Sequence, residues 1–114
     1  MDATSRMPPP TSLQGRRVLV TQADAFMGPA LCAGLAACGA EVVASREPLT
    51  EPDAAAQVVA AAGALDAVVA NLALPAPSTP VLEVDEQEWR ALFAALVDPL
   101  PRLVLNFEER GIDE

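Results

Sequence analysis

A short apolar run, a tight turn and a helix follow one another near the start of the chain, and this succession constrains the fold more than any other feature. Residues 16–20 are predicted to form a short buried strand, and residues 29–38 a helix. In the turn between them, residues 21–28, the helix N-terminus would point its free N–H groups at an anion. Strand, turn and helix in this order open a doubly wound α/β unit.

Two further strands are predicted from apolar runs. Residues 41–45 form the second strand and follow Gly39, which ends the first helix as a C-terminal glycine does. Residues 53–62 are predicted to form a second helix that stops at Gly63, and residues 65–70 a third buried strand. We therefore expect an α/β fold: a partial doubly wound, Rossmann-like parallel sheet of three to four strands with flanking helices.

The clearest amphipathic helix of the chain follows a proline-rich loop at residues 72–80. Asp85 and Glu88 have the spacing of a capping box. Proline interrupts the pattern, so a kink or an early end is expected near Asp98, and residues 105–111 resemble a polar, glycine-marked stop. The apolar positions at helical spacing are Trp89, Leu92, Phe93, Leu96, Val97 and Leu100.

Composition and charge exclude several classes of protein. The chain of 114 residues is 52% hydrophobic, enough for one domain, which we place at residues 15–114 after a flexible, proline-rich tail at residues 1–14. A formal charge of −9 would repel a phosphate backbone, so no nucleic-acid partner is expected. No apolar run is long enough to span a membrane and no secretion signal is present, which favours a cytoplasmic location. Two cysteines without any histidine predict no metal site.

The turn at residues 21–28 resembles the cofactor loop of short-chain dehydrogenases/reductases, although two of its glycines are replaced. Thr21 and Gly28 match that family's pattern, whereas Gln22 and Phe26 stand where it has glycine. Asn71, after the third predicted strand, matches one residue of another family motif, and the family's tetrad asparagine would fall on Leu96. The resemblance implies NAD or NADP as cofactor for an ordinary member, with Arg46 available for a 2′-phosphate. A solvated loop arginine remains the alternative for Arg46.

The same loop is similar to that of halohydrin dehalogenases, a branch with this fold that converts haloalcohols to epoxide and halide without a redox cofactor. Thr21, Phe26 and Gly28 fit the branch's pattern. The resemblance implies that Phe26 forms one wall of a halide site. Packing in the core remains the alternative for Phe26, and turn formation the alternative for Asn71. The halide- or cofactor-side loop is Thr21, Gln22, Phe26, Met27 and Gly28, and the substrate-side loop is Asn71, Leu72, Leu74 and Pro75.

Catalytic residues are not assigned within this chain. It contains no tyrosine, and the Ser and the Tyr with its Arg or Lys that the resemblance implies belong to a segment after residue 114. We therefore expect the N-terminal part of a halohydrin dehalogenase-like protein, inactive alone, as a fragment or split gene product. A C-terminal half would complete the site for a small-molecule substrate and halide.

Two alternatives stay open, and one partner is expected in addition. The first alternative is a fragment of a divergent NAD(P)-dependent reductase of the same superfamily. The second is a non-catalytic interaction module that associates through the apolar helix. We also expect a homo-oligomer formed through the helix at residues 85–104.

Overall fold

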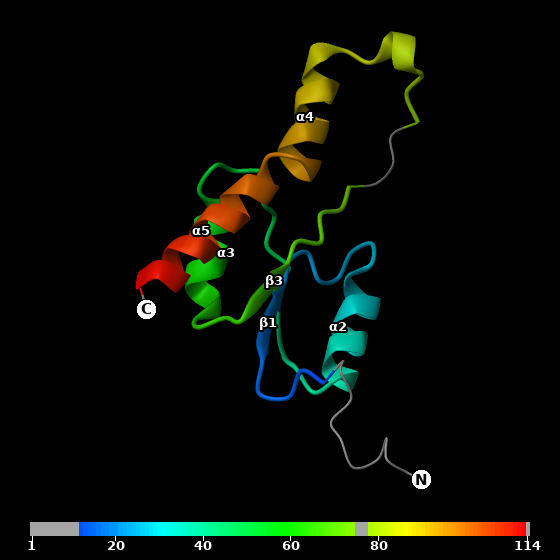
Figure 1. Cartoon of the computed structure of the whole chain (residues 1–114). Coiled ribbons are helices and arrows are strands. Elements are labelled where there is room, and N and C mark those ends of the chain that lie inside the picture. Colours follow the sequence, from blue (N-terminus) through cyan, green and yellow to red (C-terminus); the bar gives the residue numbers. More distant parts are fainter. Residues whose placement is uncertain (1–11, 75–77, 114) are drawn as a thin grey trace.

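Figure 1 shows the chain as a computed structural model, which describes residues 12–74 and 78–113. Strands and helices alternate through the first two thirds of this structure, and two helices follow. The strands are β1 (Arg17–Val20), β2 (Glu41–Ala44) and β3 (Ala67–Val69). The helices are α2 (Gly28–Ala37), α3 (Ala54–Ala62), the short 3₁₀ turn η1 (Val81–Glu83), α4 (Glu86–Leu96) and α5 (Pro99–Asp113).

The strands form one parallel sheet in the order β2-β1-β3. Val18 of β1 is opposite Val42 of β2 on one side and Ala67 of β3 on the other. The chain therefore moves from β1 to one neighbour and then crosses to the opposite neighbour, which is the connectivity of a doubly wound sheet. The expectation of a partial doubly wound sheet with flanking helices is confirmed.

Helices cover both faces of the sheet (Figure 1). Helix α2 packs on β1 and β2, while α3 and α5 pack against each other on the opposite side. The main apolar cluster lies on this second side and includes Leu19 of β1 and Leu103 of α5, both almost fully buried. Helix α3 contributes Ala55, Val58, Val59 and Ala62, which recur at the spacing of one helix face.

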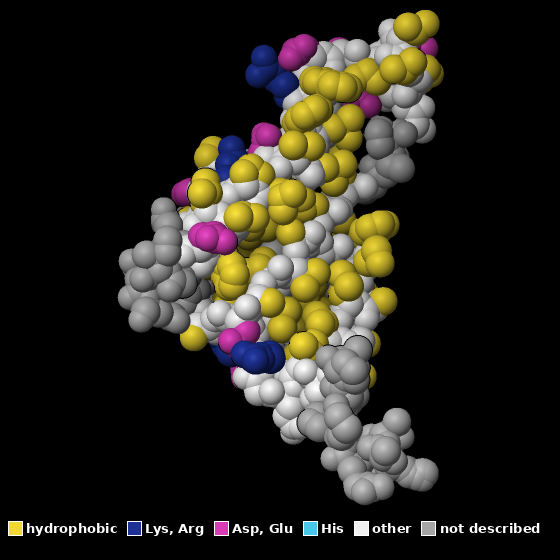
Figure 2. Space-filling view, viewed as in Figure 1, with side chains coloured by type: hydrophobic (Ala, Val, Ile, Leu, Met, Phe, Trp, Pro, Cys, Tyr) yellow, Lys and Arg dark blue, Asp and Glu magenta, His cyan; other side chains and the backbone are white. Residues whose placement is uncertain are grey.

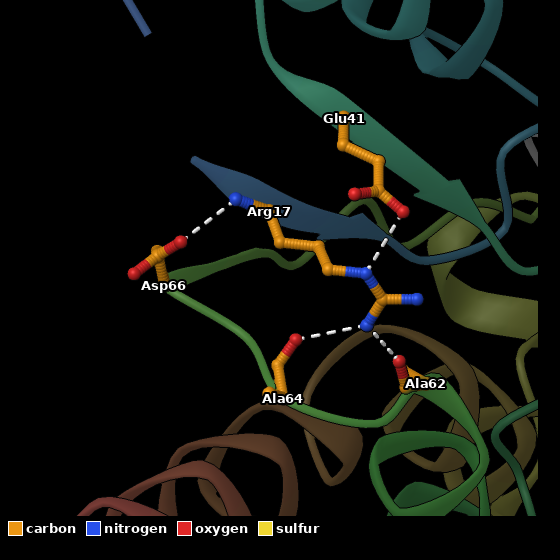
Figure 3. A network of polar contacts seen from close by, with 5 residues as sticks. All are labelled: Arg17, Glu41, Ala62, Ala64 and Asp66. Atoms are coloured by element: carbon orange, nitrogen blue, oxygen red, sulfur yellow. Dashed lines mark hydrogen bonds and ion pairs between the residues drawn. The ribbon is translucent and has the colours of Figure 1, made fainter. Parts of the chain in front are cut away.

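Arg17 links the N-terminal ends of the strands to helix α3 (Figure 3). Its guanidinium group donates to the carbonyl oxygens of Ala62 and Ala64, at and beyond the C-terminus of α3, and to Glu41 Oε2 at 3.0 Å. Its backbone N–H donates to Asp66 Oδ2 at 2.8 Å. Because a helix C-terminus carries unpaired carbonyls and partial negative charge, a cation stabilises it. Arg17 therefore joins both outer strands' ends to α3.

The last two helices match the sequence prediction in part. Asp85 caps α4, because its Oδ1 accepts a hydrogen bond from the Glu88 N–H at 2.8 Å, and the helix is interrupted before Pro99 as expected. The predicted polar stop at residues 105–111 is wrong, since α5 continues to Asp113. Packing of Leu103 against α3 anchors this helix, and one interior glycine costs only about 1 kcal/mol of helix stability.

The N-terminal boundary lies slightly earlier than the sequence suggested. The backbone N–H of Leu13 donates to the carbonyl oxygen of Cys38 at 2.8 Å, so the packed structure includes residues just before Gly15. Residues 1–11 of the expected tail lie outside the described residues. Within residues 12–74 and 78–113, no helix has the length and apolar character that a bilayer crossing needs.

Candidate functional site

The candidate site lies at the carboxyl end of the sheet, where the loops after β1 and β3 meet. Strand β1 is central: the chain passes from it to β2 on one side and then crosses from β2 to β3 on the other side. Open α/β sheets bind ligands in the crevice at such a switch point. The structure thus brings the sequence-predicted residues 21–28 next to residues 71–74.

Thr21 and Asn71 join the two loops through buried and partly buried hydrogen bonds. Thr21 is fully buried, and its hydroxyl donates to the Asn71 carbonyl oxygen at 2.8 Å. The Asn71 side chain is 5% exposed and its Nδ2 donates to the carbonyl oxygens of Gln22 and Ala25, both at 2.9 Å. Both amide hydrogens of Asn71 are therefore used within the protein. This arrangement favours the structural alternative for Asn71 over a contact with substrate.

The Gln22 side chain spans the crevice between the two loops. Its Oε1 accepts a hydrogen bond from the backbone N–H of Ala73 at 2.9 Å, and its Nε2 donates to the Ala73 carbonyl oxygen at 3.4 Å. The primary amide thus pairs with both polar groups of one backbone residue, as a neighbouring strand would. Neither the sequence nor the resemblance indicated this pairing, because Ala73 takes part only through its backbone.

Two residues of the loop adopt the left-handed conformation that favours glycine. The φ angles are 44° at Gln22 and 53° at Phe26. These are the two positions at which the resemblance places glycine. A residue with a Cβ is disfavoured there by roughly 1–2 kcal/mol. The backbone shape that glycine allows is therefore kept in this loop, although the side chains have changed.

Gly28 begins α2 and fits tightly under the loop. A Cβ at this position would collide with the backbone carbonyl of Ala23 and come within 2.8 Å of its Cα. The Gly28 N–H donates to the Ala25 carbonyl oxygen at 2.8 Å. No side chain of the described residues caps the N-terminus of α2, whose N-cap is Met27. The helix therefore keeps its N-terminal positive end uncompensated at the crevice.

We compared the chain with protein families, curated proteins and solved structures. No protein-family model matches the chain, and no curated protein matches it. Solved structures do match. A proposed short-chain alcohol dehydrogenase from Sinorhizobium meliloti 1021 has 25% sequence identity and a TM-score of 0.77 over 86% of this chain and 50% of that one. The chain has the fold of a short-chain dehydrogenase/reductase.

Two further structures support the same fold. A proposed 2-deoxy-D-gluconate 3-dehydrogenase from Agrobacterium tumefaciens, solved with bound NADP, has 26% identity and a TM-score of 0.61 over 89% of this chain and 49% of its own. An NADH-dependent reductase of alginate metabolism has 16% identity and a TM-score of 0.68, with 87% and 52% covered. This chain therefore spans about half the length of the short-chain dehydrogenases/reductases that it matches.

Most of the apolar residues of the predicted site are exposed and do not pack in the core. Phe26 is 77% exposed and Met27 51%, so the alternative that Phe26 packs in the core is wrong. Phe26 has a positive φ in this turn, and its side chain faces solvent. Leu72 packs against the main core, whereas Leu74 is 41% exposed. Pro75 lies outside the described residues.

Arg46 lies beside a cavity of about 450 Å³ next to β2. Strand β2 and the following loop line one side of the cavity through Val43, Ser45 and Arg46, and α3 lines the other through Gln57 and Val58. The Arg46 side chain is exposed and has no ion pair among the described residues. Its guanidinium group is therefore available to an anionic ligand. Within the described residues, no group of His, Cys, Asp or Glu could hold a metal ion.

Proposed function

We propose that this chain is the nucleotide-binding part of an NAD(P)-dependent oxidoreductase of the short-chain dehydrogenase/reductase type. The observation that carries the proposal is the backbone of residues 21–28. Gln22 and Phe26 keep the left-handed conformation of a glycine loop, and Gly28 keeps the close contact between loop and helix. In dinucleotide-binding folds, this loop and the following helix N-terminus hold the pyrophosphate.

The residues around the loop fit such a ligand. The uncapped N-terminus of α2 supplies N–H groups and a positive end for phosphate oxygens. Arg46 follows β2 and lies beside a cavity, where a guanidinium group would pair with a 2′-phosphate and favour NADP over NAD. When bound, the nicotinamide would supply the hydride chemistry. We assign no catalytic residue to this chain, because it contains neither tyrosine nor histidine.

Calorimetric titration with NADH and NADPH tests the proposal. We expect saturable binding of NADPH, with weaker binding of NADH. Arg46→Ala should weaken NADPH binding by about tenfold or more, since it removes a charge-assisted contact, while NADH binding stays unchanged. Arg90→Ala is the matched control, because Arg90 is an exposed arginine on α4 whose ion pair is with Glu86, four residues earlier in the same helix. Absence of binding by either dinucleotide would refute the nucleotide-binding function.

The halohydrin dehalogenase alternative has less support. Such an enzyme needs a dry, weakly polar site for its halide, but Phe26 is largely exposed among the described residues. The solved structures reported above are dehydrogenases and reductases. Bromide titration separates the two: binding of bromide without binding of dinucleotide would favour the dehalogenase.

A second function, as an interaction module, rests on the exposed apolar face of α4 and α5. Figure 2 shows apolar side chains gathered along α4 and onto α5. Trp89 is 54% exposed and packs against Phe93 in a tilted arrangement with ring centroids 5.1 Å apart, while Leu100 is 48% exposed. Contiguous exposed apolar surface of this kind marks protein–protein contact sites. We propose that this face, within residues 85–104, joins two copies of the chain.

Sedimentation measurements test the self-association. We expect a dimer at micromolar concentration and a monomer for Trp89→Ser, because large aromatic side chains contribute most of the affinity at interfaces. The control is Leu82→Ser, an exposed apolar residue in η1, outside this face. A wild-type monomer across the concentration range would contradict the proposal.

A further inference from the structure

We propose that Gln22 controls the affinity of the nucleotide site: its side chain closes the crevice between β1 and β3, and a dinucleotide binds only after the Gln22–Ala73 pair opens. This inference rests on the proposed nucleotide-binding function. It assigns a role to a residue that replaces glycine in the loop.

Two hydrogen bonds between the Gln22 side chain and the backbone of Ala73 form the closure. Gln22 Oε1 accepts from the Ala73 N–H at 2.9 Å, and Nε2 reaches the Ala73 carbonyl oxygen at 3.4 Å. Gln22 is half-buried between the loops, in the crevice at which open α/β sheets bind their ligands. A pyrophosphate must approach the loop backbone closely there, and glycine normally allows this approach. In the proposed closed state, the Gln22 side chain, held against Ala73, takes up the space that this approach would need.

The main chain of the site does not depend on this pair. Asn71 donates to the backbone carbonyls of Gln22 and Ala25, and Thr21 donates to the Asn71 carbonyl. These three bonds are buried or partly buried and involve no atom of the Gln22 side chain. The side chain can therefore leave the crevice while both loops stay anchored.

A closed state lowers the apparent affinity in proportion to its population. If the binding-competent state is only a fraction of the total, the apparent dissociation constant rises by the inverse of that fraction. A hydrogen-bonded pair of this kind favours the closed state by about tenfold. Removal of the pair should therefore strengthen dinucleotide binding by about tenfold.

Substitution of Gln22 by asparagine is the sharpest test. Asparagine tolerates the left-handed conformation better than most residues, but its side chain is one methylene shorter and cannot pair with both groups of Ala73. Q22N thus removes the closure without new backbone strain. Q22A is the second variant, and Q87A on the exposed surface of α4 is the control glutamine substitution. Circular dichroism establishes that each variant is folded.

Two measurements on the free and titrated chain decide the outcome. We expect amide hydrogen exchange at Ala73 to become about tenfold faster in Q22N and Q22A, and NADPH to bind about tenfold more tightly, with no change in Q87A. Unchanged exchange at Ala73 would overturn the closure. Faster exchange together with unchanged or weaker NADPH binding would overturn the role of Gln22 alone. No dinucleotide binding by any variant, with faster exchange, would overturn the nucleotide-binding function and with it the effect on affinity.

Discussion

Replacement of Gly28 by alanine tests whether the loop at residues 21–28 is packed as tightly as its shape requires. The added Cβ would collide with the Ala23 carbonyl and lie 2.8 Å from the Ala23 Cα. Both atoms belong to the backbone, so no side chain can turn aside to make room. Either the loop or the start of α2 must move.

The expected loss of stability follows from this geometry. Overpacking in a well-packed region costs typically 1–3 kcal/mol, and a backbone collision belongs at the upper end, about 2–3 kcal/mol. For a domain of this size, each 1 kcal/mol lowers the melting temperature by roughly 4–8 °C. Displacement of the loop should also weaken NADPH binding, because the proposed phosphate site is formed by the same backbone.

Gly34 provides a control in the same helix. A Cβ there would meet no atom within 4 Å, and the residue is exposed. Gly34→Ala should therefore stabilise the chain by about 0.5–1 kcal/mol through helix propensity alone. Urea denaturation followed by circular dichroism measures both variants. If Gly28→Ala is no less stable than wild type to within about 0.5 kcal/mol, the tight-packing argument is refuted.

Three further substitutions test single contacts by the same urea denaturation. Asn71→Ala should cost about 2–4 kcal/mol, because it leaves two partly buried carbonyls without their donor; a loss below 1 kcal/mol would show that the bonds do not hold the loops together. Arg17→Ala should cost about 1–2 kcal/mol by uncapping α3, whereas the exposed Arg16→Ala should be nearly neutral, and equal effects would contradict this capping. Asp85→Ala should cost about 1 kcal/mol, and an unchanged midpoint would mean that its side chain does not stabilise α4.

Much of the fold could be predicted from local patterns. The three apolar runs became β1, β2 and β3, and Gly39 and Gly63 both have positive φ where the preceding helices end. The Asp85 cap lies where its spacing from Glu88 placed it. These features depend on residue propensities and on hydrogen bonds between residues close together in the sequence, so a short stretch of sequence is enough to predict them. The early stop of the last helix was wrong because contacts of α5 with α3, distant in sequence, outweigh a polar segment.

For the candidate site too, some features were determined by the sequence and others only by the tertiary structure. The sequence by itself determined that a strand–turn–helix loop starts the fold, that Gln22 and Phe26 replace glycines in it, and that Asn71 follows the strand beside it. Only the tertiary structure decided what these replacements do. Gln22 pairs with the backbone of Ala73, Asn71 anchors the loop, and Phe26 faces outward. The reason is that a side chain's partner here is a backbone group about fifty positions away, and backbone groups carry no sequence signal.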